Sequence, residues 1–122
     1  MLVEDDPDIR AVARMSLRRA GFEVMTVDCG ERLIAQAADA APDVVLLDWI
    51  LPGMDGLETL TALRANPRTA SIPVIFLTGR TEPDAIERAI ASGAIGCLPK
   101  PFNALTLGTE VMRMFTEWTA HV

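Results

Sequence analysis

Four short apolar runs in this 122-residue chain end on residues that can do chemistry. The first run is followed by Glu4 and Asp5, the second by Asp48, the third by Thr78 and the fourth by Lys100. Short apolar runs between helical patterns are typical of buried parallel strands, and open α/β sheets bind ligands beyond the carboxyl ends of such strands. We therefore expect three carboxylates, a hydroxyl and an ammonium group to meet in one pocket.

This set of groups suits phosphoryl transfer. A carboxylate at the position of Asp48 can attack phosphorus and form an acyl phosphate. Glu4 and Asp5 beside it add negative charge, at roughly 1 to 4 kcal/mol of repulsion for each close pair, which a divalent cation relieves. Oxygen ligands favour magnesium, or manganese, with Asp5 and Asp48 as direct ligands and Glu4 acting through water. Lys100 supplies a positive charge and Thr78 a hydroxyl donor for the phosphoryl oxygens.

Composition narrows the classes of function. Half of the residues are apolar, which allows one domain with its own core. The net charge of −6 argues against nucleic-acid binding, and no apolar stretch approaches the roughly 20 residues that span a bilayer. We therefore expect a cytoplasmic domain that binds neither nucleic acid nor membrane. Cys29 and Cys97 are far apart and His121 is the only histidine, so a disulfide, a zinc site and a Ser-His-Asp triad are all excluded.

Strand and helix patterns alternate five times along the chain. The strands are expected at residues 1–3, 23–27, 44–47, 73–78 and 96–99. The helices are expected from Asp6 to Gly21, around residues 33–38, from 56 to 65, from Thr81 to Gly93, and from Asn103 to Thr119. This alternation predicts one doubly wound α/β sheet with right-handed crossovers.

Four segments then resemble the signature blocks of the receiver domain of response regulators, in the order and at about the spacing of that family. They read VEDDP at 3–7, LDWILPGMDG at 47–56, LTG at 77–79 and PKPF at 99–102. The resemblance covers nearly the whole chain. It implies a flavodoxin-like (βα)5 fold with strand order 2-1-3-4-5. It also implies a two-component or phosphorelay function, in which a sensor histidine kinase or a histidine phosphotransfer protein phosphorylates Asp48.

The resemblance assigns further roles to residues around the pocket. It makes the Ile50 carbonyl a backbone ligand of the magnesium ion, and it implies a cis bond between Lys100 and Pro101 that directs the ammonium group inward. Ile50 and Arg80 lie two residues beyond Asp48 and Thr78, at positions that border the path of the hydrolytic water. An apolar side chain and a long cation there predict slow self-dephosphorylation, because neither offers a base to orient water.

The sequence departs from the family pattern in three places. Cys97 stands where the family usually has an aromatic residue, so we expect the switch to act through Thr78 drawing in the loop after the fourth strand. The first strand is shorter than the usual five or six residues, and we expect that residues upstream of Met1 complete it. No output domain follows the receiver pattern, which leaves both a stand-alone regulator and a fragment of a larger protein open.

The last helix is apolar over about half of its circumference. We assign a core-facing stripe that consists of Leu107, Val111, Met114, Phe115 and Trp118. Leu105 and Met112 fall outside this stripe. We therefore expect them to border a partner or self-association surface formed by the fourth helix, the fifth strand and the last helix.

Two other functions compete with the phosphoacceptor hypothesis. A docking or dimerisation receiver that works without phosphorylation is suggested by Cys97 alone. A phosphohydrolase of the haloacid dehalogenase type also uses an aspartate at a strand end, but it needs a second acid two residues later, where this chain has Ile50. Glu4 and Asp5 as helix caps, and Asp48 as a solvated strand end, are the purely structural alternatives.

Overall fold

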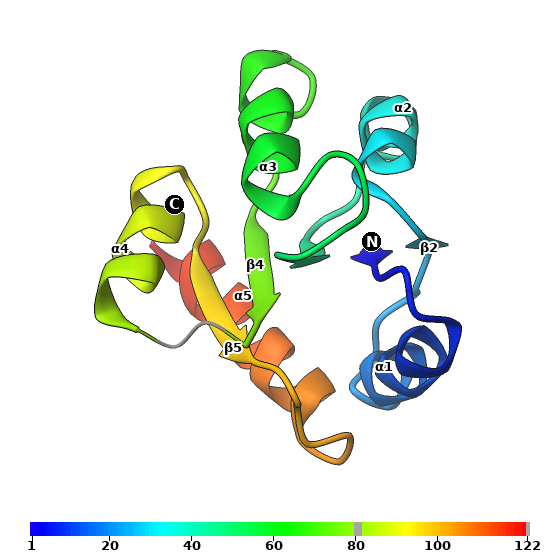
Figure 1. Ribbon diagram of the computed structural model, residues 1–122. Helices are drawn as coiled ribbons and strands as arrows, with labels where there is room; N and C mark the ends of the chain where they lie inside the picture. The colour runs from blue at the N-terminus through cyan, green and yellow to red at the C-terminus, as the bar shows by residue number, and fades with distance from the viewer. Residues whose placement is uncertain (80–81, 122) are drawn as a thin grey trace.

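The computed structural model describes residues 1–79 and 82–121, and within them strands and helices alternate along the chain (Figure 1). The elements are β1 (Leu2–Val3), α1 (Pro7–Arg19), β2 (Thr26–Val27), α2 (Gly30–Ala40), β3 (Val45–Asp48), α3 (Gly56–Ala65), β4 (Val74–Thr78), α4 (Pro83–Ala91), β5 (Gly96–Pro99) and α5 (Leu107–Ala120). All strand pairs are parallel, in the order β2-β1-β3-β4-β5. The predicted flavodoxin-like fold is confirmed.

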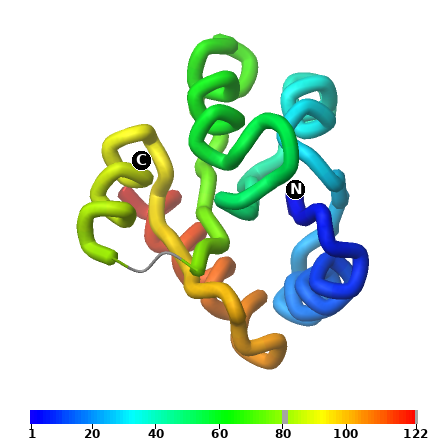
Figure 2. Tube along the Cα trace, viewed as in Figure 1, coloured from blue at the N-terminus to red at the C-terminus, as the bar shows by residue number. Residues whose placement is uncertain are grey.

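The sheet is covered by helices on both faces, as Figures 1 and 2 show. Helices α1 and α5 pack on one face, where Leu17 and Val111 join the core beneath them. Helices α2, α3 and α4 pack on the other face, around Leu33, Leu60 and Ala89. Because both faces are covered, the central strands are apolar on successive residues, and β4 is buried over its whole length.

Two helices begin where the sequence predicts. Asp6 caps α1, because its Oδ1 accepts hydrogen bonds from the backbone N–H groups of Asp8 and Ile9 at 2.8 and 3.1 Å. Asp55 caps α3 in the same way, accepting from the N–H of Glu58 at 2.9 Å. These caps set the directions in which the chain leaves β1 and the loop after β3, the two segments that carry the acidic residues.

Other boundaries differ from the prediction. β2 comprises Thr26–Val27 rather than residues 23–27, because β1 offers only Leu2 and Val3 for pairing. Helix α5 starts at Leu107, and the side chain of Asn103 instead caps a preceding turn by accepting from the N–H of Leu105 at 2.8 Å. The predicted cap Thr81 lies outside the described residues.

Glycine allows the site-bearing strand to contact its helix closely. Gly56, the first residue of α3, lies against the end of β3, where an added Cβ would come within 2.8 Å of the Asp48 carbonyl oxygen and of Trp49 Cα. Contacts that short cannot be relieved by a flexible side chain, because both atoms belong to the backbone. Gly56 therefore fixes α3 against the strand that carries Asp48.

No helix in the described part of the chain is long and apolar enough to cross a membrane.

Candidate functional site

Backbone hydrogen bonds bring the ends of neighbouring strands together at the carboxyl edge of the sheet. The N–H of Glu4 donates to the Val27 carbonyl at 3.1 Å, and the N–H of Lys100 donates to the Thr78 carbonyl at 2.9 Å. The N–H of Trp49 donates to the Leu77 carbonyl at 3.0 Å. Sheet-like bonding therefore continues past the ends of the strands, so that residues far apart in sequence lie side by side.

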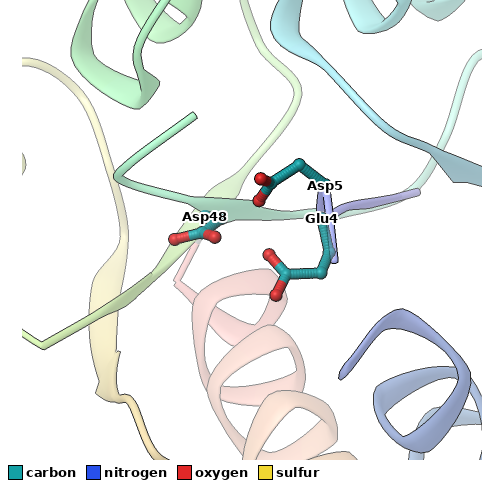
Figure 3. A group of neighbouring side chains, drawn as sticks. All are labelled: Glu4, Asp5 and Asp48. Atoms are coloured by element: carbon teal, nitrogen blue, oxygen red, sulfur yellow. The ribbon is translucent and has the colours of Figure 1, made fainter. Parts of the chain in front are cut away.

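The three predicted carboxylates meet at this edge. Glu4, Asp5 and Asp48 each contribute an oxygen, and these oxygens lie within 4.8 Å of one another (Figure 3). Glu4 is fully buried and Asp48 is 3% exposed, whereas Asp5 is exposed. An oxygen-only set with one solvent-exposed member fits a hard divalent cation that keeps part of its water shell. The residues present therefore fit the predicted magnesium ion.

Lys100 places its ammonium group between the two buried carboxylates. Its Nζ lies 2.7 Å from Asp48 Oδ2 and 2.8 Å from Glu4 Oε1, and its side chain is 24% exposed. The peptide bond between Lys100 and Pro101 is cis, as the resemblance implied. These contacts neutralise part of the charge of Glu4 and Asp48, which would otherwise be costly to bury.

The pKa values reflect burial together with this crowding of charge. Burial raises the pKa of Glu4 to about 7, with the neighbouring Asp48 adding to the rise and Lys100 opposing it. Burial alone would lower the pKa of Lys100, but its hydrogen bonds and ion pairs with Asp48 and Glu4 outweigh that effect, and the pKa is raised. Glu4 thus takes up a proton at a higher pH than an ordinary glutamate does, while Lys100 stays charged.

Ile50 and Thr78 lie next to Asp48 and Lys100. The N–H of Ile50 donates to Asp48 Oδ1 at 3.3 Å, and the Ile50 side chain is 71% exposed. Thr78 is 3% exposed at the end of β4 and is joined to Lys100 through the backbone. Arg80, the predicted neighbour of the water path, lies outside the described residues.

Cys97 occupies a half-buried position in β5, opposite Phe76 of β4. Its side chain packs against the core beneath α4. Helix α4 contributes the small residues Ala85 and Ala89 to this core. Burial raises the pKa of the Cys97 thiol, which keeps it protonated. The side chain therefore serves as a small packing residue beneath α4.

The expectation for the partner surface was wrong for Met112. Met112 lines a hollow with Met1, Phe22 and Phe115, on the side of the connection between α1 and β2, rather than a surface beside α4 and β5. The projection of the helix alone could not show which flank faces which neighbour. Leu105 is 78% exposed in the segment before α5. The structure gives α4 two exposed apolar side chains instead, Ile86 and Ile90.

Sequence reasoning missed Arg10 as a contributor to the site. Its Nη1 donates to the backbone carbonyl of Glu4 at 2.9 Å, from one turn inside α1. The contact holds the peptide group that joins Glu4 to Asp5, so it helps to direct one side chain inward and the next toward solvent. A basic residue one helical turn after a cap at Asp6 was the only signal, and that spacing is common in helices.

Glu4 should make the stability of the metal-free protein depend on pH. The folded state raises its pKa from 4.5 to about 7, so it binds the proton more tightly than the unfolded state does. The contribution of Glu4 to the free energy of unfolding should therefore be largest below pH 4.5 and fall as the pH rises to about 7. Urea unfolding in a chelator should show this fall in the parent and in an exposed-acid control, Glu58→Gln, but much less of it in Glu4→Gln. Parallel curves for all three proteins would contradict the assignment.

The comparisons with known proteins agree with this geometry. The chain matches the response regulator receiver domain family over residues 1–112. It is 36% identical over 113 residues to the phosphate regulon transcriptional regulatory protein PhoB of Rhizobium meliloti, covering 93% of this chain and 50% of that protein. It is 39% identical over 102 residues to the transcriptional regulator NtrC of Salmonella typhimurium, covering 84% of this chain and 21% of that protein.

Solved structures give the same result. The chemotaxis response regulator CheY4 of Vibrio cholerae superposes with a TM-score of 0.85 at 35% identity, covering 93% of this chain and 94% of that one. The chain spans half or less of the length of the curated relatives described above. With its parallel sheet and its acidic pocket beside a lysine, the chain belongs to the receiver domain family of two-component response regulators.

Proposed function

We propose that Asp48 is the phosphoacceptor of this receiver domain, and that the donor is the phosphohistidine of a sensor histidine kinase or a histidine phosphotransfer protein in the cytoplasm. One Asp48 oxygen attacks phosphorus, the bond from phosphorus to the donor nitrogen breaks, and its electron pair stays on the imidazole. The observation that carries the proposal is the Lys100 Nζ, 2.7 Å from Asp48 Oδ2 in a pocket of carboxylates.

An apolar groove lined by Ile9, Val12 and Phe102 borders Lys100, and we propose that the donor docks there.

The pocket residues divide the remaining work. Asp5, Asp48 and the Ile50 carbonyl would hold Mg²⁺, or Mn²⁺, directly, with Glu4 acting through water. When bound, the ion neutralises charge on the phosphoryl oxygens. Lys100 is already beside the acceptor oxygen, so its ammonium group can pair with a phosphoryl oxygen without a long movement. Thr78, at the end of the adjacent strand, offers a hydroxyl donor to another phosphoryl oxygen.

Asp5→Ala should remove the response of the protein to magnesium. A ligand bound only by the folded state stabilises it by about 2.7 kcal/mol at 100 times its dissociation constant. Magnesium should therefore raise the melting temperature of the parent by several degrees and that of Asp5→Ala scarcely at all. Asp8→Ala removes a neighbouring exposed acid outside the cluster and should respond like the parent. Equal shifts in Asp5→Ala and the parent would exclude Asp5 from the site.

Asp48→Asn should abolish phosphoryl uptake, because the amide keeps the shape of the carboxylate but is a poor nucleophile. The measurement is the gain in mass after incubation with magnesium and acetyl phosphate, with circular dichroism to verify folding. Asp8→Asn is the matched control and should be modified like the parent. Uptake by Asp48→Asn at the parent rate would mean that the acceptor lies elsewhere. A parent that is never modified would favour the alternative of a docking receiver that works without phosphorylation.

We further propose that the phosphorylated state decays slowly. The N–H of Ile50 contacts Asp48, and its exposed apolar side chain has no group that can orient water. The family resemblance assigns the long cation Arg80 to the border of the same water path. The double variant Ile50→Asn, Arg80→Glu should lose its phosphoryl group roughly ten times faster than the parent, because its new polar side chains can orient the hydrolytic water. Ile90→Asn, a change at an exposed isoleucine on α4, should decay like the parent. Slower decay in the double variant would oppose this explanation.

We propose that the face formed by α4, β5 and α5 associates with a second copy of the chain when Asp48 is phosphorylated. Ile86 and Ile90 on α4 are exposed, and on α5 Met114 and Trp118 line a hollow with Ile95, the residue before β5. Exposed charges of both signs flank these residues, namely Glu87, Arg88, Arg113 and Glu117. A two-fold arrangement can therefore pair opposite charges around an apolar centre.

Light scattering with and without beryllofluoride should detect this association. We expect the parent to associate more strongly with the phosphoryl mimic, and the double variant Ile86→Glu, Ile90→Glu to stay monomeric, because it buries charge at the centre of the face. Val12→Glu, Met15→Glu changes two exposed apolar residues on α1 and should associate like the parent. No effect of the mimic on the parent would refute the switch, and association of the α4 variant would locate the interface elsewhere.

A further inference from the structure

The first turn of α2 holds the loop that follows Asp48. Oε1 of Glu31 accepts a hydrogen bond from the backbone N–H of Met54 at 3.2 Å. Oε2 of the same carboxylate would lie 3.2 Å from a Cβ added at Gly53, whose φ of 72° marks the turn. The Glu31 carboxylate thus lies against the peptide group that joins Gly53 to Met54, although Glu31 is 23 residues away in sequence.

A second contact fixes the same end of the loop. Gly30 packs so tightly that an added Cβ would overlap Thr59 Oγ1 and come within 3.3 Å of the Met54 carbonyl oxygen. Thr59 Oγ1 in turn donates to the Asp55 carbonyl at 2.7 Å. The start of α2 and the start of α3 therefore enclose residues 53–55 from two sides.

The other end of the loop is held by the sheet. Trp49 is 4% exposed and packs on Phe76, with ring centroids 5.1 Å apart, and Leu51 is buried. Between these two anchored side chains lies Ile50, whose N–H donates to Asp48 Oδ1 at 3.3 Å. The backbone of Ile50 is thus positioned by β3 on one side and, through residues 53 and 54, by Glu31 on the other.

We propose that Glu31 is a positioning residue, which holds the loop of residues 49–55 so that the Ile50 backbone faces the acidic pocket and thereby strengthens divalent-cation binding. The inference rests on the proposed function through the ligand role of Ile50. Partners that orient metal ligands from outside the coordination shell commonly change metal affinity by 10- to 100-fold when removed. Glu31 would do this through a backbone ligand, from a helix that contributes no residue to the carboxylate cluster.

A simpler role for Glu31 is that of an acid in the first turn of α2, where a negative charge is favourable beside the helix N-terminus. The two roles predict different results for Glu31→Gln. This variant loses the charge but keeps a side-chain oxygen that can accept from the Met54 N–H. Glu31→Ala loses both. Asp84→Ala, which removes an exposed first-turn acid of α4, controls for the charge effect on a helix away from the loop.

The experiment combines a magnesium titration with hydrogen exchange. The parent and each variant carry Trp118→Phe, so that Trp49, next to the acceptor, is the only tryptophan and reports magnesium binding by its fluorescence. Hydrogen exchange is followed at the Met54 amide. We expect Glu31→Ala to raise the magnesium dissociation constant about tenfold and to speed Met54 exchange. Glu31→Gln and Asp84→Ala should stay close to the parent in both measurements.

Three outcomes would overturn the inference. If Glu31→Ala matches the parent in dissociation constant and in Met54 exchange, the contact does not position the loop. If Glu31→Gln weakens magnesium binding as much as Glu31→Ala does, charge is responsible rather than the hydrogen bond. If Met54 exchange is faster in Glu31→Ala but the parent does not respond to magnesium, the contact does hold the loop. The proposed magnesium site then fails, and the role of Glu31 in cation binding fails for the same reason.

Discussion

The ammonium group of Lys100, between Glu4 and Asp48, is the interaction on which the rest of the site depends. Two carboxylates that are almost completely buried would repel each other strongly without a cation between them. One ammonium group does not balance three carboxylates, so the pocket keeps a net affinity for positive charge. A proton on Glu4 or a divalent cation can each relieve this imbalance. Burial, together with this crowding of charge, raises the pKa of Glu4, and the same crowding underlies the proposed chemistry.

A parallel sheet is what assembles this pocket from distant parts of the chain. The ends of β1, β3, β4 and β5 all point to one edge, and backbone bonds between Lys100 and Thr78 and between Trp49 and Leu77 extend the pairing to the site itself. Helices on both faces bury the strands, so the polar residues can only gather where the strands end. The surrounding contacts from Arg10, Gly56 and Glu31 come from helices, and they hold backbone rather than acidic side chains.

The alternation of strands and helices and the carboxylate cluster could be predicted from the sequence, because both depend on local patterns, whereas the strand order was implied by the resemblance to the family. Apolar runs that end at Asp48 and at Lys100 define strand ends, and parallel strands bring such ends together. Features set by pairing or by helix rotation were not predictable in this way. The length of β2 depends on how much of β1 is available, and the place of Met112 depends on which flank of α5 faces α1. Arg10 and Glu31 act through hydrogen bonds to backbone groups, which leave no distinctive pattern in the sequence.

The most direct test of the central claim is chemical identification of the acceptor. The protein would be phosphorylated with acetyl phosphate and magnesium and then reduced with borohydride, which converts an aspartyl phosphate into homoserine, and the peptides would be sequenced by mass spectrometry. We predict homoserine at position 48 and nowhere else, and only in protein that was exposed to the phosphodonor. Homoserine at another aspartate, or an unmodified position 48 in protein that has taken up phosphate, would contradict it.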